Sequence, residues 1–250
     1  MFSQKSTRLF YFIPIFYVCI LAVSCASKKQ SDKKIFRYNE TSGIASLDPA
    51  FAKNQSVMWV VHQLYNTLVE VDDQLQIKPS LAYRWEFSDD KRIILFHLRT
   101  DVYFNDDAVF INGKGRKLTA ADVQYSLERI LDKNTASPGS WIFNNRVDSI
   151  HPFVAVNDST FQLRLLQPFQ PILGILSMQY CSVVAREAVK HYGNDFRRHP
   201  VGSGPFSFVA WEEGQALVLK KNEHYYEKDS SGYAYPYLDG IKVSFYDSKA

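Results

Sequence analysis

This sequence contains few cysteines, and its cysteines and histidines do not fall at the spacings that are typical of metal sites. Only three cysteines occur among 250 residues, and they form no Cys-x-x-Cys pair of the kind that holds zinc. The histidines also never fall at His-x-x-x-His or His-Glu-x-x-His spacing; they are His62, His97, His151, His191, His199 and His224. We therefore expect no metal site and no cofactor.

Motifs of hydrolytic and phosphate-binding enzymes are missing as well. Ser203 lies between two glycines, but the Gly-x-Ser-x-Gly pattern of a nucleophile elbow does not surround it. The run Gly113-Lys114-Gly115 is too short for a phosphate-binding loop and predicts a turn. Adjacent carboxylates at 89–90, 106–107 and 212–213 fall in turns, where solvated side chains are expected. The sequence thus predicts a protein that is not an enzyme and has no catalytic residues.

An excess of charge of one sign is also lacking. Lysine and arginine number 29 against 26 acidic residues, and nothing in this balance indicates nucleic-acid binding. The composition is 46% hydrophobic and 15% aromatic, which is enough to bury a substantial core. We expect a folded, globular protein.

The first 24 residues have the pattern of a secretory signal. Lys5 and Arg8 precede an apolar run at 9–23 that Pro14 interrupts, and the run is shorter than the about 20 residues of a spanning helix. Small residues then precede Cys25, so the site resembles a bacterial lipobox in which Cys25 becomes the lipidated first residue. The alternative is an ordinary signal peptide cleaved nearby.

An anchor at Cys25 has two consequences for the mature chain. Cys181 would be its only other thiol, so no intramolecular disulfide could form. Residues 25–34 would be a basic tether beside lipid headgroups, with lysines at 28, 29, 33 and 34. We expect a lipid-anchored protein of the cell envelope, on the periplasmic or outer face of the membrane.

The clearest structural pattern lies between residues 81 and 131. Apolar residues alternate on both sides of the turn at 88–90 and predict a β-hairpin; they are Trp85, Phe87, Ile94, Phe96 and Leu98. Thr119 and Asp122 then form a capping-box pattern that opens a helix carrying Val123, Leu127 and Ile130 on one face. We expect this helix to cover the hairpin.

Other elements of both kinds are predicted along the chain. A helix begins at residue 54 or 55 with Asn54 as its N-cap, and its apolar face comprises Val57, Val60, Val61, Leu64 and Leu68. Short helices are expected at 172–176 and around Glu187, the latter ending at Gly193. Strands are expected at 35–38, 154–156, 161–165, 181–184 and 241–246, with a further hairpin whose tip is Glu213-Gly214 and a loop near 112–115.

Several of these stretches resemble one known family. The runs PSLAYRWEFSDD, FHLRTDVYFND and LTAADVQYSLERILD, and the later turn GSGPF, are similar to the extracytoplasmic solute-binding family 5, the oligopeptide- and dipeptide-binding proteins of ABC importers. The resemblance implies a mixed α/β fold of the two-lobed periplasmic-binding-protein type II. It further implies a discontinuous first large lobe at 35–65 and 183–250, an inserted α+β subdomain at 66–182, and a second large lobe that is missing here.

The resemblance also implies a function and a site. A peptide would be captured and delivered to an ABC permease with cytoplasmic ATPases, by a protein held to the membrane through its lipid anchor. The expected ligand surface is the exposed start of the helix, at Ala52, Lys53, Asn54 and Gln55, because a helix N-terminus can present free N–H groups to a ligand; the alternative is a capped surface helix. Trp141 is expected to replace a ligand-contacting tyrosine that the family has at the position of Gly139.

Other functions remain open at this point. Within the family, the ligand could instead be a nickel chelate, haem or an oligosaccharide. From a different class, the chain could be a lipid-anchored hydrolase.

Overall fold

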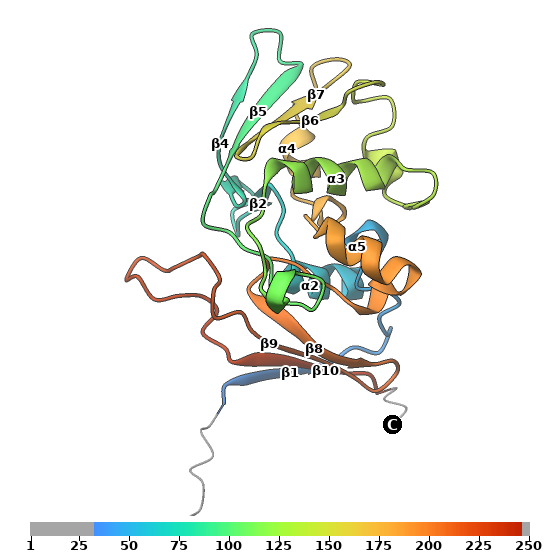
Figure 1. Cartoon of the computed structure of the whole chain (residues 1–250), viewed down its shortest axis with the longest axis vertical. Helices are drawn as coiled ribbons and strands as arrows, with labels where there is room; N and C mark the ends of the chain where they lie inside the picture. The colour runs from blue at the N-terminus through green and yellow to red at the C-terminus, as the bar shows by residue number, and fades with distance from the viewer. Residues whose placement is uncertain (1–32, 247–250) are drawn as a thin grey trace, which may run out of the picture. The chain divides into compact units, whose positions relative to one another are not determined.

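The computed structural model describes residues 33–246, and residues 34–246 belong to one compact unit. The predicted signal, Cys25 and most of the predicted tether lie outside the described residues. Two four-stranded sheets, a two-stranded ribbon and several helices form the unit (Figure 1). The structure is therefore mixed α/β, as the sequence predicts.

The first sheet joins the start of the described chain to its end. Its order is β1-β10-β9-β8, and β1 runs parallel to β10 while the other pairs are antiparallel. The strands are β1 (Ile35–Asn39), β8 (Phe206–Glu212), β9 (Ala216–Lys221) and β10 (Gly240–Ser244). The hairpin tip predicted at Glu213-Gly214 is confirmed, whereas the last strand ends at Ser244 instead of Tyr246.

The second sheet contains the hairpin predicted around residues 88–90 and a second hairpin, which is formed by the strands predicted at 154–156 and 161–165. Its order is β4-β5-β7-β6, and Trp85 pairs with Phe96 as the alternation requires. The strands are β4 (Ala82–Phe87), β5 (Ile93–Leu98), β6 (Phe153–Asn157) and β7 (Thr160–Arg164). Phe96 and Phe161 are fully buried on the inner face, and Phe87 on the edge strand is exposed.

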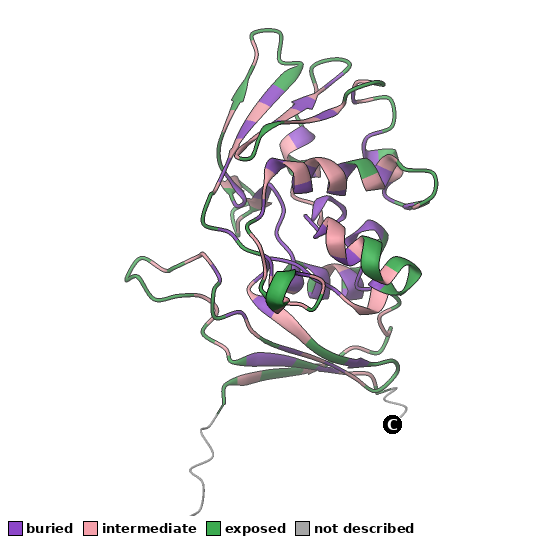
Figure 2. Cartoon of the chain, viewed as in Figure 1, coloured by how far each residue is buried: buried purple, intermediate pink, exposed green. Residues whose placement is uncertain are grey.

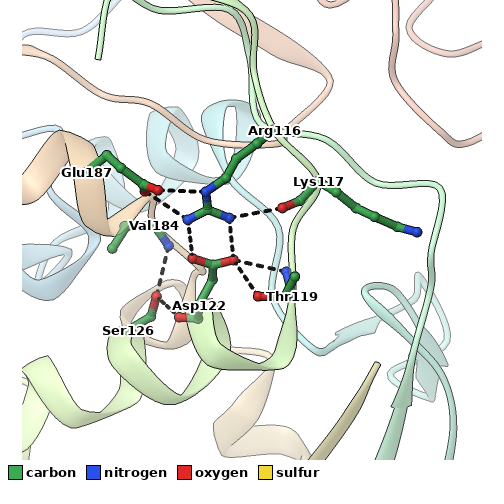
Figure 3. Close-up of polar contacts among 7 residues, drawn as sticks. All are labelled: Arg116, Lys117, Thr119, Asp122, Ser126, Val184 and Glu187. Atoms are coloured by element: carbon green, nitrogen blue, oxygen red, sulfur yellow. Dashed lines mark hydrogen bonds and ion pairs between the residues drawn. The ribbon is translucent and has the colours of Figure 1, made fainter. Parts of the chain in front are cut away.

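Helix α3 (Ala120–Leu131) does not cover the first hairpin as expected. It packs mainly against β6 and β7. These two strands belong to the same sheet as the first hairpin because β5 pairs with β7, so that β7 lies inside the sheet and β6 forms its edge. Its predicted start is confirmed, since the Thr119 N–H donates to Asp122 Oδ2 over 2.9 Å. Figure 3 shows that Arg116 completes this start by binding both Asp122 and Glu187.

The remaining helices are short. They are α2 (Gln55–Leu64), α4 (Ile172–Leu176) and α5 (Arg186–Tyr192), with 3-10 turns at Pro49–Phe51, Ile111–Gly113, Ser140–Ile142, Gln179–Cys181 and Gly193–Arg198. Helix α2 ends four residues before Leu68, which is buried in the following loop instead of on the helix face. The end of α5 at Gly193 is confirmed, and the positive φ of 52° there suits glycine.

The strand predicted at 181–184 is wrong. The Val183 N–H donates to the carbonyl of Asn66, and the Val184 N–H donates to Ser126 Oγ on α3. A buried apolar run thus obtains its backbone hydrogen bonds from a loop and a side chain, without a neighbouring strand. A small ribbon of β2 (Val69–Val71) and β3 (Ile77–Pro79) lies close to Asn66 in the sequence.

One continuous core lies beneath both sheets. Figure 2 shows buried residues in strands of both sheets and along α2 and α3. Among residues 33–246, no helix is both long enough and apolar enough to cross a membrane. The same residues contain no cluster of His, Cys, Asp and Glu suited to a metal ion.

Candidate functional site

An open cavity of about 800 Å³ lies beside the loop that connects β1 to α2. Three parts of the chain form it: this loop, the middle and C-terminal end of α3 with the segment that follows it, and the region around α5. Its lining comprises Ala45, Ser46, Asp48, Phe51, Lys53, Asn54, Val57, Tyr125, Arg129, Asp132, Asn134, Thr135, Pro138, Val189, Gly193, Asn194 and Arg197. The wall is both polar and apolar, as a site for an amphipathic ligand requires.

The segment from Gly43 to Ser46 belongs to no helix or strand, and its last two residues, Ala45 and Ser46, line this cavity. Two of its carbonyls are used, since Ser56 Oγ donates to Gly43 O over 3.1 Å and Arg197 Nη1 donates to Ala45 O over 3.3 Å. By contrast, the four backbone N–H groups of 43–46 donate to no group among the described residues. Because main-chain donors need a partner, these four are available to a ligand or to solvent.

The start of α2 adds further donors at the same place. Asn54 is the N-cap residue, as the sequence predicts, but its side chain makes no capping hydrogen bond. The N–H groups of the first helical turn therefore have no side-chain cap at this end. Lys53 is exposed and its ammonium forms no ion pair within residues 33–246.

The structure separates the four residues expected at this surface. Lys53 and Asn54 line the cavity, whereas Gln55 lines a separate apolar groove along α2. The expected exposure of Ala52 is wrong, since its side chain is fully buried and its N–H donates to the Pro49 carbonyl over 3.0 Å. The 3-10 turn at 49–51 directs this methyl group into the core.

Trp141 does not lie among the residues that line the cavity. Its side chain is 53% exposed on the 3-10 turn Ser140–Ile142, and its carbonyl accepts from Arg146. At Gly139, an added Cβ would lie 2.5 Å from the Tyr180 ring. Hence this backbone leaves no room for a tyrosine there, and the structure gives Trp141 no contact with the cavity.

Apart from Lys53, the charged residues of the cavity wall escaped the sequence-based expectations. Arg129 donates to both oxygens of Asp48 within the wall, whereas Arg197 and Arg198 share the carboxylate of Glu213, which is not one of the lining residues. A signal for Arg129 does exist, because it falls at i+7 from Asp122 on the face of α3 that also carries buried Ser126. A polar stripe on the inner face of a helix indicates buried partners.

Comparison with known proteins places this chain in a family. Residues 76–250 match the bacterial extracellular solute-binding proteins, family 5 Middle. The peptide transport periplasmic protein SapA of Salmonella typhimurium is 30% identical over 177 residues, which is 66% of this chain and 32% of SapA. The glutathione-binding protein GsiB of the same species is 28% identical over 200 residues, which is 80% of this chain and 36% of GsiB.

A solved structure agrees. The ABC transporter-associated periplasmic binding protein DppA from Helicobacter pylori, in complex with the peptide STSA, matches with a TM-score of 0.72 and 27% identity. The match covers 85% of this chain and 42% of DppA, so the chain spans well under half the length of these relatives. The relatives are solute-binding proteins, which agrees with the expectation that the chain is not an enzyme. The chain belongs to the bacterial extracellular solute-binding proteins of family 5.

Proposed function

We propose that this chain forms one wall of the peptide site in the substrate-binding component of an ABC importer. One observation carries the proposal: four consecutive N–H groups, at residues 43–46, have no partner among the described residues, and two of these residues, Ala45 and Ser46, line an open cavity of about 800 Å³. In an extended segment every second N–H group points to the same side, so alternate donors of this segment could pair with carbonyl oxygens of an extended peptide. Main-chain pairing of this kind binds a peptide without selecting its side chains.

The rest of the wall suits the same ligand. The uncapped start of α2 and the exposed Lys53 favour a carboxylate or a carbonyl, because both a helix N-terminus and an ammonium attract negative charge. Arg129 is already paired with Asp48, whereas Arg197 shares the single carboxylate of Glu213 with Arg198, so a net positive charge remains beside this part of the wall and also favours a carboxylate. Nothing in this arrangement calls for covalent chemistry.

Capture by such a wall requires a second surface. A ligand bound on one side keeps most of its polar groups in water, and little free energy is gained from excluding solvent. The relatives are more than twice as long as the matched region, which leaves room for a second lobe that closes over the ligand about a hinge. The acidic partner of a peptide's ammonium belongs to that lobe in this proposal.

The proposal extends to the cell envelope. Cys25 carries a lipid that holds the protein to the membrane, and the loaded protein delivers its peptide to a permease with cytoplasmic ATPases. Support comes from the lipobox-like sequence before Cys25 and from the peptide-transport relatives. The discontinuous lobe at 35–65 and 183–250, with the inserted subdomain at 66–182, is part of the same proposal and is supported by the pairing of β1 with β10.

Calorimetric titration of the protein from its native source with a mixed peptide library tests this function. We expect stoichiometric binding, with every peptide recovered intact by mass spectrometry afterwards. Cleaved peptides would replace the proposal with a hydrolase. Binding of a nickel chelate, haem or an oligosaccharide in place of peptides would keep the family role and reject the ligand.

A further inference from the structure

The outward face of the first sheet is basic. Residues 240 and 242 of β10 point to one side of the sheet, whereas Ile241 between them is buried on the side that faces the core. Arg37 of β1 pairs with Lys242, and Lys220 of β9 pairs with Gly240, so all three cationic side chains lie on the outward side. All three are exposed. We name Arg37, Lys220 and Lys242 the basic face.

These three cations have no acidic partner nearby. Among residues 33–246 no carboxylate forms an ion pair with any of them, and Arg37 donates to the carbonyl of Ile35 on its own strand over 3.3 Å. At the outward positions of the four strands the only acidic residue is Glu212, which lies at the end of the opposite edge strand, β8, and accepts from Gln215 over 2.8 Å. The basic face therefore carries an excess of positive charge.

The basic face is not a surface that a further layer of the fold would bury. Figure 1 shows the described helices on one side of this sheet, and the basic face is turned to the other. Taking an unpaired ammonium or guanidinium group out of water is costly, so we expect this side to remain at the surface of the folded protein. An antiparallel sheet commonly leaves one face in water, but an excess of one sign of charge favours a partner of the opposite sign.

The chain enters this sheet directly from the predicted tether. The Lys34 N–H donates to Asp239 Oδ2 over 2.7 Å, and the Asp239 N–H donates to the Lys34 carbonyl over 2.9 Å, which holds the start of β1 beside β10. Cys25 precedes Lys34 by nine residues, and a fully extended chain of this length spans at most about 30 Å. A lipid on Cys25 would thus keep the basic face within reach of the headgroups, where an anionic surface attracts cations over a Debye length of about 8 Å.

We infer that the basic face docks on the anionic phospholipid headgroups of the membrane that holds the protein. Each lysine or arginine close to such a surface strengthens the attachment roughly fivefold, so three together orient the protein on its anchor. None of the three lines the candidate cavity, so this contact leaves the cavity free for a ligand. The inference rests on the proposed anchor at Cys25, which brings the face to the membrane, and is independent of the proposed peptide ligand.

Lysine labelling of the mature protein from its native membranes, with the lipid it carries, tests the inference. The protein would be inserted into preformed vesicles of phosphatidylcholine alone or of an equal mixture with phosphatidylglycerol, and acetylation of single lysines would be followed by mass spectrometry. We expect Lys220 and Lys242 to react at least about fivefold more slowly in the mixed vesicles, and high salt to abolish the difference. Lys91 is the control, because it is exposed on the β4–β5 turn at the other end of the unit (Figure 1), and it should react equally in both.

The outcomes separate the basic face from the anchor. A protein that does not float with phosphatidylcholine vesicles would reject the anchor and this inference together. A protein that floats, but whose Lys220 and Lys242 react equally in both kinds of vesicle or are slowed no more than Lys91, would reject the inference alone. Stronger protection by heparin in the absence of vesicles would assign the face to a soluble polyanion and also overturn the inference.

An Arg37→Gln variant tests the same contact without removing a labelled lysine. We expect the protection of Lys242 in mixed vesicles to fall by up to about fivefold, because one of the three cations is lost. Arg84→Gln is the matched control: it removes the same charge from an exposed position of the second sheet and should leave the protection unchanged. Circular dichroism reports that both variants are folded. Protection that is unchanged by Arg37→Gln, or that falls equally in the two variants, would contradict the inference.

Discussion

Arg129 on α3 and Asp48 in the loop before α2 form an ion pair that closes one wall of the candidate cavity. Arg129 Nη2 lies 2.7 Å from Asp48 Oδ2, and Nη1 lies 3.1 Å from Oδ1. Both side chains are largely buried, at 11% and 6% exposed. The pair therefore joins the segment that carries the free N–H groups to the helix that packs on the second sheet.

Breaking this pair should destabilise the protein strongly. In an Arg129→Met variant the carboxylate of Asp48 stays buried without its cation, and we expect the free energy of unfolding to fall by about 3–5 kcal/mol. Urea denaturation followed by circular dichroism measures the change. The matched control is Lys114→Met, because the Lys114–Asp106 pair is 75% and 50% exposed and should contribute less than about 1 kcal/mol. Equal losses in the two variants would contradict the structural role of the buried pair.

The turn before β8 should tolerate no side chain at Gly202. A Cβ there would lie 2.0 Å from the carbonyl oxygen of Leu64, at the end of α2. We expect Gly202→Ala to lower the free energy of unfolding by about 3 kcal/mol, since backbone atoms would have to move. Gly174 is the control: a Cβ added there would meet no heavy atom within 4 Å, and alanine inside α4 should be neutral or stabilising by up to about 1 kcal/mol. A thermal melt that ranks the two variants the other way would reject this packing.

Acid should weaken the contact between Glu187 and Arg116. The hydrogen bonds from Arg116, at 2.7 and 2.8 Å, hold the pKa of Glu187 below its usual value. A carboxylate of this kind stabilises the fold above its unfolded pKa, and the contribution is lost as the pH falls through the lower folded pKa. Because Glu187 is 40% exposed, we expect less than about 1 kcal/mol near neutral pH.

A Glu187→Gln variant should remove this part of the pH dependence. The difference in unfolding free energy between the variant and the parent should shrink as the pH is lowered from about 7 to about 3. Glu223→Gln, at an exposed residue without an ion pair in the described part of the chain, is the control and should show no such trend. A constant difference across the range would mean that Glu187 acts through packing alone.

Cys25 should determine partitioning into the membrane. We expect mass spectrometry of the membrane fraction to find an acylated peptide that begins at Cys25, because the lipobox-like sequence places cleavage directly before it. In a Cys25→Ser variant the protein should leave the membrane fraction. A parent protein that starts at another residue and is soluble would contradict the anchor.

The sequence predicts best what depends on neighbouring residues. The alternation around residues 88–90 and the Thr119–Asp122 cap are local patterns, and both appear in the structure as expected. The strand at 181–184 failed because its backbone partners, Asn66 and Ser126, lie far away in the sequence. Which hairpin α3 covers likewise depends on the pairing of β5 with β7, which no local pattern encodes.

The predictions for the candidate site also differ according to whether they depend on neighbouring residues or on residues far away in the sequence. Asn54 and Lys53 were predicted from a local signal, the helix N-terminus, and both line the candidate cavity, while their contact with a ligand stays a prediction. Ala52 was misplaced because the direction of its side chain is fixed by the 3-10 turn before it. The four free N–H groups at 43–46 have no sequence signature, since a missing hydrogen bond becomes visible only when every neighbour is in place.

Amide NMR during titration with one tripeptide tests the central claim most directly. In the chain from residue 26, we expect the N–H resonances of residues 43–46 to shift, with a dissociation constant in the millimolar range, about 1 mM, because only one wall is present. Ile44→Pro removes one of these donors and should weaken the response, whereas Ile44→Ala retains the donor and should preserve it; the undisturbed core resonances report that each variant is folded. The account predicts shifts confined to 43–46 and the start of α2. Shifts centred on the Trp59 indole, or a response unchanged by Ile44→Pro, would contradict it.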